Sequence, residues 1–367
     1  MWYQTKASEI LGIQYPILQG PFGGNLSSVE LVSTVSNLGG LGGYGAYTLS
    51  PNEIIEVDRQ IKQATNKPYN INLWVSDSDA LDGTVSDQHF QRAQDLFKPY
   101  FDELGIGMPE KPAPFKNRFE NQVEVILHQR PPVFSFMFGA PSIDILEQCH
   151  RLGIVTIGAA TTLDEAFVLE SAGVDLIIAS GFEAGGHRPS FLAPAESSTV
   201  GTFVLLQLIR EKVKTPVIAA GGIANGKGVA AALALGADAA QIGTAFLVTD
   251  ESNATDIHKE MLFSDAARYT TLSRAFTGRL GRGISSRIAT DLLQQEKGFL
   301  PFPLQTQFMS HLRKEAIAQE KWDMILFWGG QIAPILKHRK AAKLMHTIVE
   351  ETSAYFDNLM SERQQSR

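Results

Sequence analysis

Residues 216–236 read PVIAAGGIANGKGVAAALALG, and DAAQIG follows at 238–243. The apolar run PVIAA (216–220) predicts a buried strand, the two glycines after it predict a turn, and residues 226–235 are typical of a helix. DAAQIG then predicts a second strand. Strand, loop, helix and strand in this order are the repeating unit of a parallel βα fold.

The same unit repeats along most of the chain. Short apolar runs, each followed by glycine or proline and then by helix-patterned sequence, predict eight strands. These strands are PILQ (16–19), LGGYG (41–45), NINLWV (70–75), VFSF (133–136), GIVTIG (153–158), VDLIIA (174–179), PVIAA (216–220) and DAAQIG (238–243). The helices expected between them cover residues 27–39, 50–64, 141–152, 162–172, 200–213 and 226–235. Eight such units over ~250 residues predict an α/β fold, the TIM (β/α)8 barrel.

Two segments fall outside this repeat. A polar stretch, residues 76–131, interrupts the chain after the third strand, and about a hundred residues follow the eighth strand. The tail has helical periodicity over 311–327 and 341–360. We therefore expect a barrel over residues 1–265, with a helical insertion at about 76–131, and a C-terminal helical extension over 266–367 packed on the barrel.

Composition narrows the class of protein. The formal charge is −7, which argues against a nucleic-acid or anionic-membrane partner, because both favour a basic surface. A single cysteine, Cys149, excludes a disulfide framework and a cysteine zinc site. The start MWYQTKASEI lacks the features of a signal peptide, and no run of eighteen apolar residues occurs. We expect a soluble cytoplasmic protein.

The active site of a TIM barrel lies in the loops after the carboxyl ends of the strands. SGFEAGGHRPSF (180–191) follows the sixth strand and places His187 in a glycine-rich loop. Alone, this histidine is also compatible with an ordinary surface turn. Its neighbouring strands favour a site, because the loops after strands seven and eight are the usual phosphate site of this fold. Those loops contain Gly221, Gly222, Gly243 and Thr244, and a helix is expected to begin shortly after Asn225.

The remaining motifs do not support another kind of site. GGLGGYG (39–45) contains a formal GxGxxG, but its glycines lie on and around a strand and do not open a long helix, so a dinucleotide site is disfavoured. The histidines show no HxH or HExxH spacing, and no metal site is expected. The chain also lacks a GxSxG nucleophile elbow and a Walker lysine motif.

A set of motifs in order along the barrel resembles a known family. The barrel motifs are PILQGPFGG (16–24), GGLGGYGAYTLSP (39–51), NINLW (70–74), SFMFGAP (135–141), GFEAGGHR (181–188), AAGGIANGKGVAAALALGAD (219–238) and QIGTAF (241–246). The resemblance continues into the tail with AFTGRLGRG (275–283), PLQ (303–305) and WGGQ (328–331). The sequence resembles the FMN-dependent nitronate monooxygenases, formerly called 2-nitropropane dioxygenases.

The resemblance implies an FMN cofactor. Its phosphate would be held by Gly221, Gly222, Gln241, Gly243 and Thr244. Its ring would lie near Pro21, Phe22 and Asn72, with the backbone of Gly185 close by. The family commonly has glutamine where this chain has Ser180, so a contact there would be shorter or mediated by water.

The resemblance also makes His187 the active-site histidine. A nitronate is an anion, and an imidazole can orient it or remove the proton that generates it from a nitroalkane. Its ordinary pKa of about 6.5 would leave both protonation states accessible near neutrality. The family reaction uses O₂ and releases a carbonyl compound and nitrite from substrates such as propionate 3-nitronate. Glu183 and Arg188 are either substrate contacts or parts of a loop salt bridge or helix cap.

Three alternatives remain open from sequence. A flavin-dependent enoyl-thioester reductase of fatty-acid synthesis shares the barrel and a similar histidine, and would need NADH or NADPH. A phosphosugar isomerase or lyase would use the same phosphate site without flavin. A non-catalytic flavin-binding scaffold is the third. The expected partners are a small anionic nitronate and O₂, and the chain is expected to be a monomer or homodimer.

Overall fold

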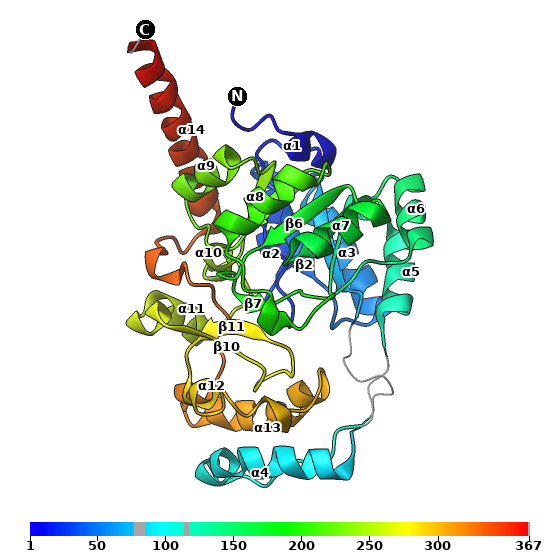
Figure 1. Cartoon of the computed structure of the whole chain (residues 1–367), viewed down its shortest axis with the longest axis vertical. Helices are drawn as coiled ribbons and strands as arrows, with labels where there is room; N and C mark the ends of the chain where they lie inside the picture. The colour runs from blue at the N-terminus through cyan, green and yellow to red at the C-terminus, as the bar shows by residue number, and fades with distance from the viewer. Residues whose placement is uncertain (77–84, 114–116, 366–367) are drawn as a thin grey trace.

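The structure, a computed structural model, describes residues 1–76, 85–113 and 117–365. Its main sheet has eight parallel strands, which confirms the predicted TIM-like barrel (Figure 1). The strands are β1 (Ile17–Gln19), β2 (Gly42–Gly45), β3 (Tyr69–Trp74), β4 (Val133–Met137), β5 (Val155–Ala160), β6 (Leu176–Ser180), β8 (Val217–Ala220) and β9 (Ala239–Ile242). Their order in the sheet is β1-β9-β8-β6-β5-β4-β3-β2. The two edges meet because the Gln19 amide donates to the Leu41 carbonyl at 2.9 Å and the Leu41 amide donates to the Ile17 carbonyl at 3.0 Å.

Helices join consecutive strands around the outside of the barrel. They are α2 (Val29–Asn37), α3 (Pro51–Ala64), α5 (Phe119–Gln129), α6 (Ile143–Arg151), α7 (Leu163–Ala172), α8 (Thr202–Lys212) and α9 (Gly226–Ala234), and the short α10 (Thr244–Leu247) follows β9. Hydroxyl N-caps begin four of them, α2, α3, α6 and α7. Ser28, for example, accepts the amide of Leu31 at the start of α2. The alternation of strand and helix read from the sequence is therefore the alternation in the structure.

The last helix of the chain completes this ring. Helix α14 (Ala341–Gln365), drawn in red in Figure 1, packs between α9 and α2. Its buried residues Leu344, Met345 and Ile348 belong to the same apolar cluster as the barrel strands. A segment expected to form part of an extension thus covers the side of the barrel where the first and last strands meet.

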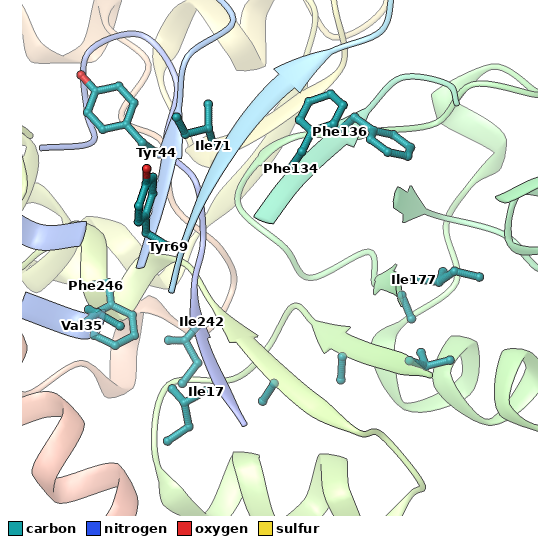
Figure 2. Packing of buried hydrophobic residues seen from close by; sticks show 14 of the residues in the cluster. Ile17, Val35, Tyr44, Tyr69, Ile71, Phe134, Phe136, Ile177, Ile242 and Phe246 are labelled. Carbon is teal, nitrogen blue, oxygen red and sulfur yellow. The ribbon is translucent and has the colours of Figure 1, made fainter. Parts of the chain in front are cut away.

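The barrel has two apolar layers. Figure 2 shows part of the outer one, in which Tyr69, Ile71, Phe134 and Phe136 of the strands belong to one buried cluster with helix residues such as Val35 of α2. The inner layer fills the barrel and includes Ala7 and Leu11 of helix α1 (Lys6–Leu11). Burying each large apolar side chain contributes roughly 1.5–3 kcal/mol, so these layers hold the strands in register.

A second layer of elements lies at one end of the barrel (Figure 1). It consists of α4 (Asp87–Leu104), α11 (Asp256–Phe263), β10 (Thr270–Ser273), β11 (Gly281–Ile284), α12 (Arg287–Asp291) and α13 (Leu304–Ala318). Phe97 and Phe101 of α4 pack against Phe308 of α13. In the described part of the predicted insertion, α4 packs on the tail and α5 packs on the ring of the barrel. Residues 77–84 and 114–116 of the predicted span lie outside the described residues.

The tail differs from the expectation in two respects. The helix predicted over 311–327 begins earlier and ends at Ala318, because Glu320 adopts a left-handed backbone (φ 54°) and a 3₁₀ turn follows at Trp322–Met324. The strands β10 and β11 were not predicted at all. The domain boundary at residue 265 stays a prediction.

Within residues 1–76, 85–113 and 117–365, no helix combines the length and the apolar composition that crossing a bilayer needs.

Helix α9 and helix α14 share a polar contact whose loss should be measurable. The Gly226 amide, at the first residue of α9, donates to Glu351 Oε2 of α14 at 2.9 Å. Glu351→Ala should lower the free energy of unfolding by about 1 kcal/mol, because it removes a charged acceptor from a helix start. The midpoint of thermal unfolding should fall by roughly 2 °C. Glu350→Ala is the matched control, since Glu350 is exposed. Equal midpoints for the two variants would contradict this role of Glu351.

Candidate active site

A cavity of about 410 Å³ opens at the carboxyl ends of the barrel strands, between the barrel and the second layer. Its position is the one that a TIM barrel predicts for an active site. All residues proposed from sequence for cofactor binding and catalysis line this single cavity. They are Pro21, Phe22, Asn72, Ser180, Gly185, His187, Gly221, Gly222, Gln241, Gly243 and Thr244.

One end of the cavity is built to accept an anion through the backbone. Gly221 (φ 109°) and Gly222 (φ 71°) adopt the left-handed conformation that favours glycine. Thr244 Oγ1 accepts the Gly330 amide at 2.9 Å, so its own proton stays available to a ligand. The Gln241 side chain lines the cavity and has no hydrogen-bond partner within the described part of the chain. Exposed backbone, a free hydroxyl proton and an unused amide fit a phosphate group.

The N-terminus of α9, the helix expected to assist this phosphate site, makes hydrogen bonds within the protein. Asn225 caps α9 by accepting the Gly228 amide at 2.9 Å, and Glu351 takes the Gly226 amide. Neither Asn225 nor Gly226 lines the cavity. Two of the first amides of α9 are therefore engaged within the protein, and a contribution of this helix N-terminus to a phosphate site stays a prediction.

His187 is held by a small second sheet. Strand β7 (Gly186–His187) pairs antiparallel with β11, placing His187 opposite Gly281, and β11 pairs with β10. The imidazole lies between Trp74 and Trp328, with ring centroids 5.1 Å and 4.7 Å away. The sequence of this loop is compatible with an ordinary surface turn, but in the structure Gly186 and His187 form a strand. Its partner, β11, lies almost a hundred residues away in sequence.

Sequence reasoning missed the hydrogen-bond partner of His187. Its Nε2 lies 2.9 Å from Thr277 Oγ1, in the turn between β10 and β11. Thr277 Oγ1 also donates to the Arg279 carbonyl at 3.1 Å and accepts the Arg279 amide. All of these contacts are satisfied together only when Nε2 carries the imidazole proton, which leaves Nδ1 as an acceptor. The motif AFTGRLGRG, quoted for the family resemblance, contains the residue that could have been suspected.

The charge state of His187 also differs from the expectation. Burial between aromatic rings lowers its pKa to about 3, and the positive charge of Arg279 acts in the same direction. Arg279 is itself buried, with its guanidinium 3.9 Å from the centroid of Phe138. The expectation that both protonation states would be accessible near neutrality is wrong for this environment, because the imidazole is neutral there.

Glu183 and Arg188 brace the loop that carries His187. Both carboxylate oxygens of Glu183 accept the Thr202 amide, at 2.9 and 3.1 Å, at the start of α8. Arg188 is only 2% exposed, and its guanidinium donates to the carbonyls of Gly181 (2.5 Å) and Ser198 (2.6 Å). Burial lowers the pKa of Arg188 to about 10. The helix-cap alternative therefore holds for Glu183, and Arg188 serves as a structural brace.

The tail covers the cavity through WGGQ (328–331). A Cβ atom at Gly185 would lie 2.5 Å from the backbone of Gly329 and Gly330, so only glycine allows this segment to approach. The Gln331 amide donates to the Glu183 carbonyl at 3.1 Å. Loop and tail are thereby joined over the barrel mouth.

Two further predicted residues, Asn72 and Ser180, lie on the barrel side of the cavity. Asn72 Nδ2 donates to Ser135 Oγ at 2.9 Å, which fixes the amide at the end of β3. Ser180 ends β6 and lines the cavity, and its role stays a prediction.

Within the described residues, no group of three or more His, Cys, Asp or Glu side chains is arranged to hold a metal ion.

Comparison with known proteins agrees with the site. The family model described as nitronate monooxygenase matches residues 4–351. A probable nitronate monooxygenase of Staphylococcus haemolyticus (strain JCSC1435) is 34% identical over 353 residues, which is 96% of this chain and 98% of that protein. Its counterpart in Staphylococcus aureus (strain Newman) is 33% identical over 352 residues, with coverage of 96% and 98%.

Solved structures share this fold over nearly the whole chain. A nitroalkane oxidase from Streptomyces ansochromogenes has a TM-score of 0.87 at 29% identity, covering 97% of this chain and 100% of its own. FabK from Thermotoga maritima has a TM-score of 0.75 at 27% identity, with coverage of 98% and 99%. The match to the family model over residues 4–351, together with relatives of 33–34% identity over 96% of the sequence, shows that this chain belongs to the nitronate monooxygenase family.

Proposed function

We propose that the protein oxidises alkyl nitronates with FMN and O₂, giving a carbonyl compound and nitrite. The observation that carries the proposal is a neutral histidine, His187, in the same cavity as a backbone site suited to phosphate. A flavin mononucleotide has a phosphate at one end and a reactive ring at the other, and so would use both parts of this cavity. Membership of the nitronate monooxygenase family supports the same reaction.

The residues of the cavity fit FMN. Gly221, Gly222, Gly243, Thr244 and Gln241 would hold its phosphate through backbone amides, one hydroxyl and one side-chain amide. Pro21, Phe22 and Asn72 would lie along its ring, Gly185 would approach it by backbone, and Ser180 would contact it directly or through water. When bound, the flavin supplies electron acceptance and the reaction with O₂, whereas the protein supplies orientation and electrostatics.

His187 would bind the nitronate as a neutral hydrogen-bond donor. In the absence of substrate, Nε2 donates to Thr277 and Nδ1 is an acceptor. An anion near Nδ1 favours the other tautomer, in which the Thr277 hydroxyl donates to Nε2 and Nδ1–H donates to the nitronate. The exchange requires only that the Thr277 hydroxyl turn from the Arg279 carbonyl to the ring. Thr277 would thus set the tautomer that the substrate needs.

The same environment disfavours proton removal from a neutral nitroalkane. A base with a pKa of about 3 takes up a proton weakly, and Arg279 opposes the formation of an imidazolium beside it. The positive charge of Arg279 has the opposite effect on a substrate that is already an anion. We therefore propose that nitronates, and not neutral nitroalkanes, are the main substrates.

An oxygen-consumption assay with the flavin-loaded protein tests the proposal. Propionate 3-nitronate should cause oxygen uptake and release nitrite, and the corresponding neutral nitro acid should react far more slowly at neutral pH. NADH with an enoyl thioester is the comparison, because it is the substrate pair of the alternative FMN-dependent NAD(P)H enoyl reductase. Turnover of the thioester without nitrite release from the nitronate would favour that reductase. A purified protein that lacks flavin absorbance would reject both.

Replacing Thr277 tests the tautomer argument. Thr277→Val keeps the shape of the side chain but removes the hydroxyl, and should lower kcat/KM for a nitronate by about tenfold, the cost of a lost buried hydrogen bond. Thr277→Ser should retain most of the activity, because it keeps the hydroxyl. Flavin content and thermal unfolding serve as controls for the fold. Equal activity of the Val and Ser variants would show that this hydrogen bond does not matter to the reaction.

A further inference from the structure

Helix α13 turns one face toward the cavity. Thr306, Met309, Ser310 and Arg313 all line it, and their spacing of three and four residues places them on successive turns of one helical face. Arg313 is the last of them and is exposed at the cavity mouth. It is a full positive charge at the edge of a pocket whose other lining groups are mostly backbone, apolar or neutral.

Arg313 has no ion-pair or hydrogen-bond partner among residues 1–76, 85–113 and 117–365. Glu183, the carboxylate that lines the same cavity, is already used by Thr202 at the start of α8. The positive charge of Arg313 also acts on a buried histidine that lines the cavity. Burial lowers the pKa of His258, another cavity residue, to about 4, and Arg313 acts in the same direction. The guanidinium is thus available to an anion that enters the cavity.

The helix also gives a length. Near the start of α13, Thr306 Oγ1 donates to the Thr277 carbonyl at 3.4 Å, and Thr277 binds His187. Arg313 follows seven residues later, and at ~1.5 Å per residue it lies about 10 Å farther along the helix axis. Apolar side chains line the second layer over this part of the cavity. They are Phe276, Met309, Leu312, Met324, Ile325 and Leu326.

We propose that Arg313 binds the carboxylate of a substrate whose nitronate end lies at His187, with an apolar chain of medium length between the two. The inference rests on the proposed nitronate oxidation and adds to it the residue that would bind the carboxylate and a chain longer than that of propionate 3-nitronate. An arginine pairs readily with a carboxylate, and the apolar wall favours methylene groups between the two anionic ends. A phosphate of the cofactor offers the same anionic chemistry, so the test must separate it from the substrate.

Two nitronates of equal chain length provide the test, one made from 8-nitrooctanoate and one from 1-nitrooctane. The wild-type protein should favour the carboxylated nitronate by about tenfold in kcat/KM, as a charge-assisted contact allows. Arg313→Ala should remove this preference through KM, with kcat and flavin content unchanged. Arg313→Lys should restore part of it. Lys314→Ala is the matched control, because Lys314 is the adjacent exposed cation and does not line the cavity.

Each other outcome has a definite meaning. A preference that survives in Arg313→Ala overturns the inference. Loss of flavin from Arg313→Ala also overturns it and assigns the residue to the cofactor phosphate. Binding of octanoate, followed by the absorbance of bound flavin without turnover, separates this inference from the proposed reaction. If neither nitronate is oxidised but octanoate binding depends on Arg313, the reaction is wrong and the carboxylate site stands. If octanoate binding is equal in both proteins, the carboxylate site is wrong.

Discussion

The pairing of β7 with β11 is the constraint on which the candidate site depends. Two residues of the loop after β6, Gly186 and His187, are held as a strand by a segment that comes from the tail. The same strand β11 bridges to Trp328 through Gly283, and Trp328 packs against the imidazole. The turn before β11 supplies Thr277. Without the tail, the barrel would present His187 on a glycine loop with none of these partners.

This arrangement explains why the histidine is neutral. Aromatic rings exclude water from it, and Arg279 from the same turn adds a nearby positive charge. A neutral imidazole with a hydroxyl partner can present either a lone pair or an N–H to a ligand, and the ligand decides which. The cavity therefore suits a substrate that arrives as an anion. Glu183 and Arg188 contribute by holding the loop in place and have no need to touch substrate.

The barrel and the residues that line the cavity could be predicted from sequence, because both follow from local patterns. Each strand lies in a short apolar run, and in a TIM barrel all loops after the strands meet at one end, so His187, Gly221 and Thr244 had to come together. The strands β10 and β11 could not be predicted, because they are short and pair with residues far away in sequence. The low pKa of His187 depends on Trp74, Trp328 and Arg279, which only the fold brings together. The position of α14 between α9 and α2 likewise depends on packing that no local pattern contains.

The central claim is that His187 contacts the nitronate. The most direct measurement is steady-state turnover of propionate 3-nitronate by the flavin-loaded His187→Asn variant, with flavin content determined on the same sample. The asparagine side chain keeps a hydrogen-bond donor, but it lacks the second tautomer that the imidazole can adopt when the Thr277 hydroxyl turns toward it. The account predicts that turnover falls by at least about tenfold while the flavin stays bound, since a positioned imidazole commonly contributes that much or more. Near-normal turnover in a variant that retains its flavin would contradict it.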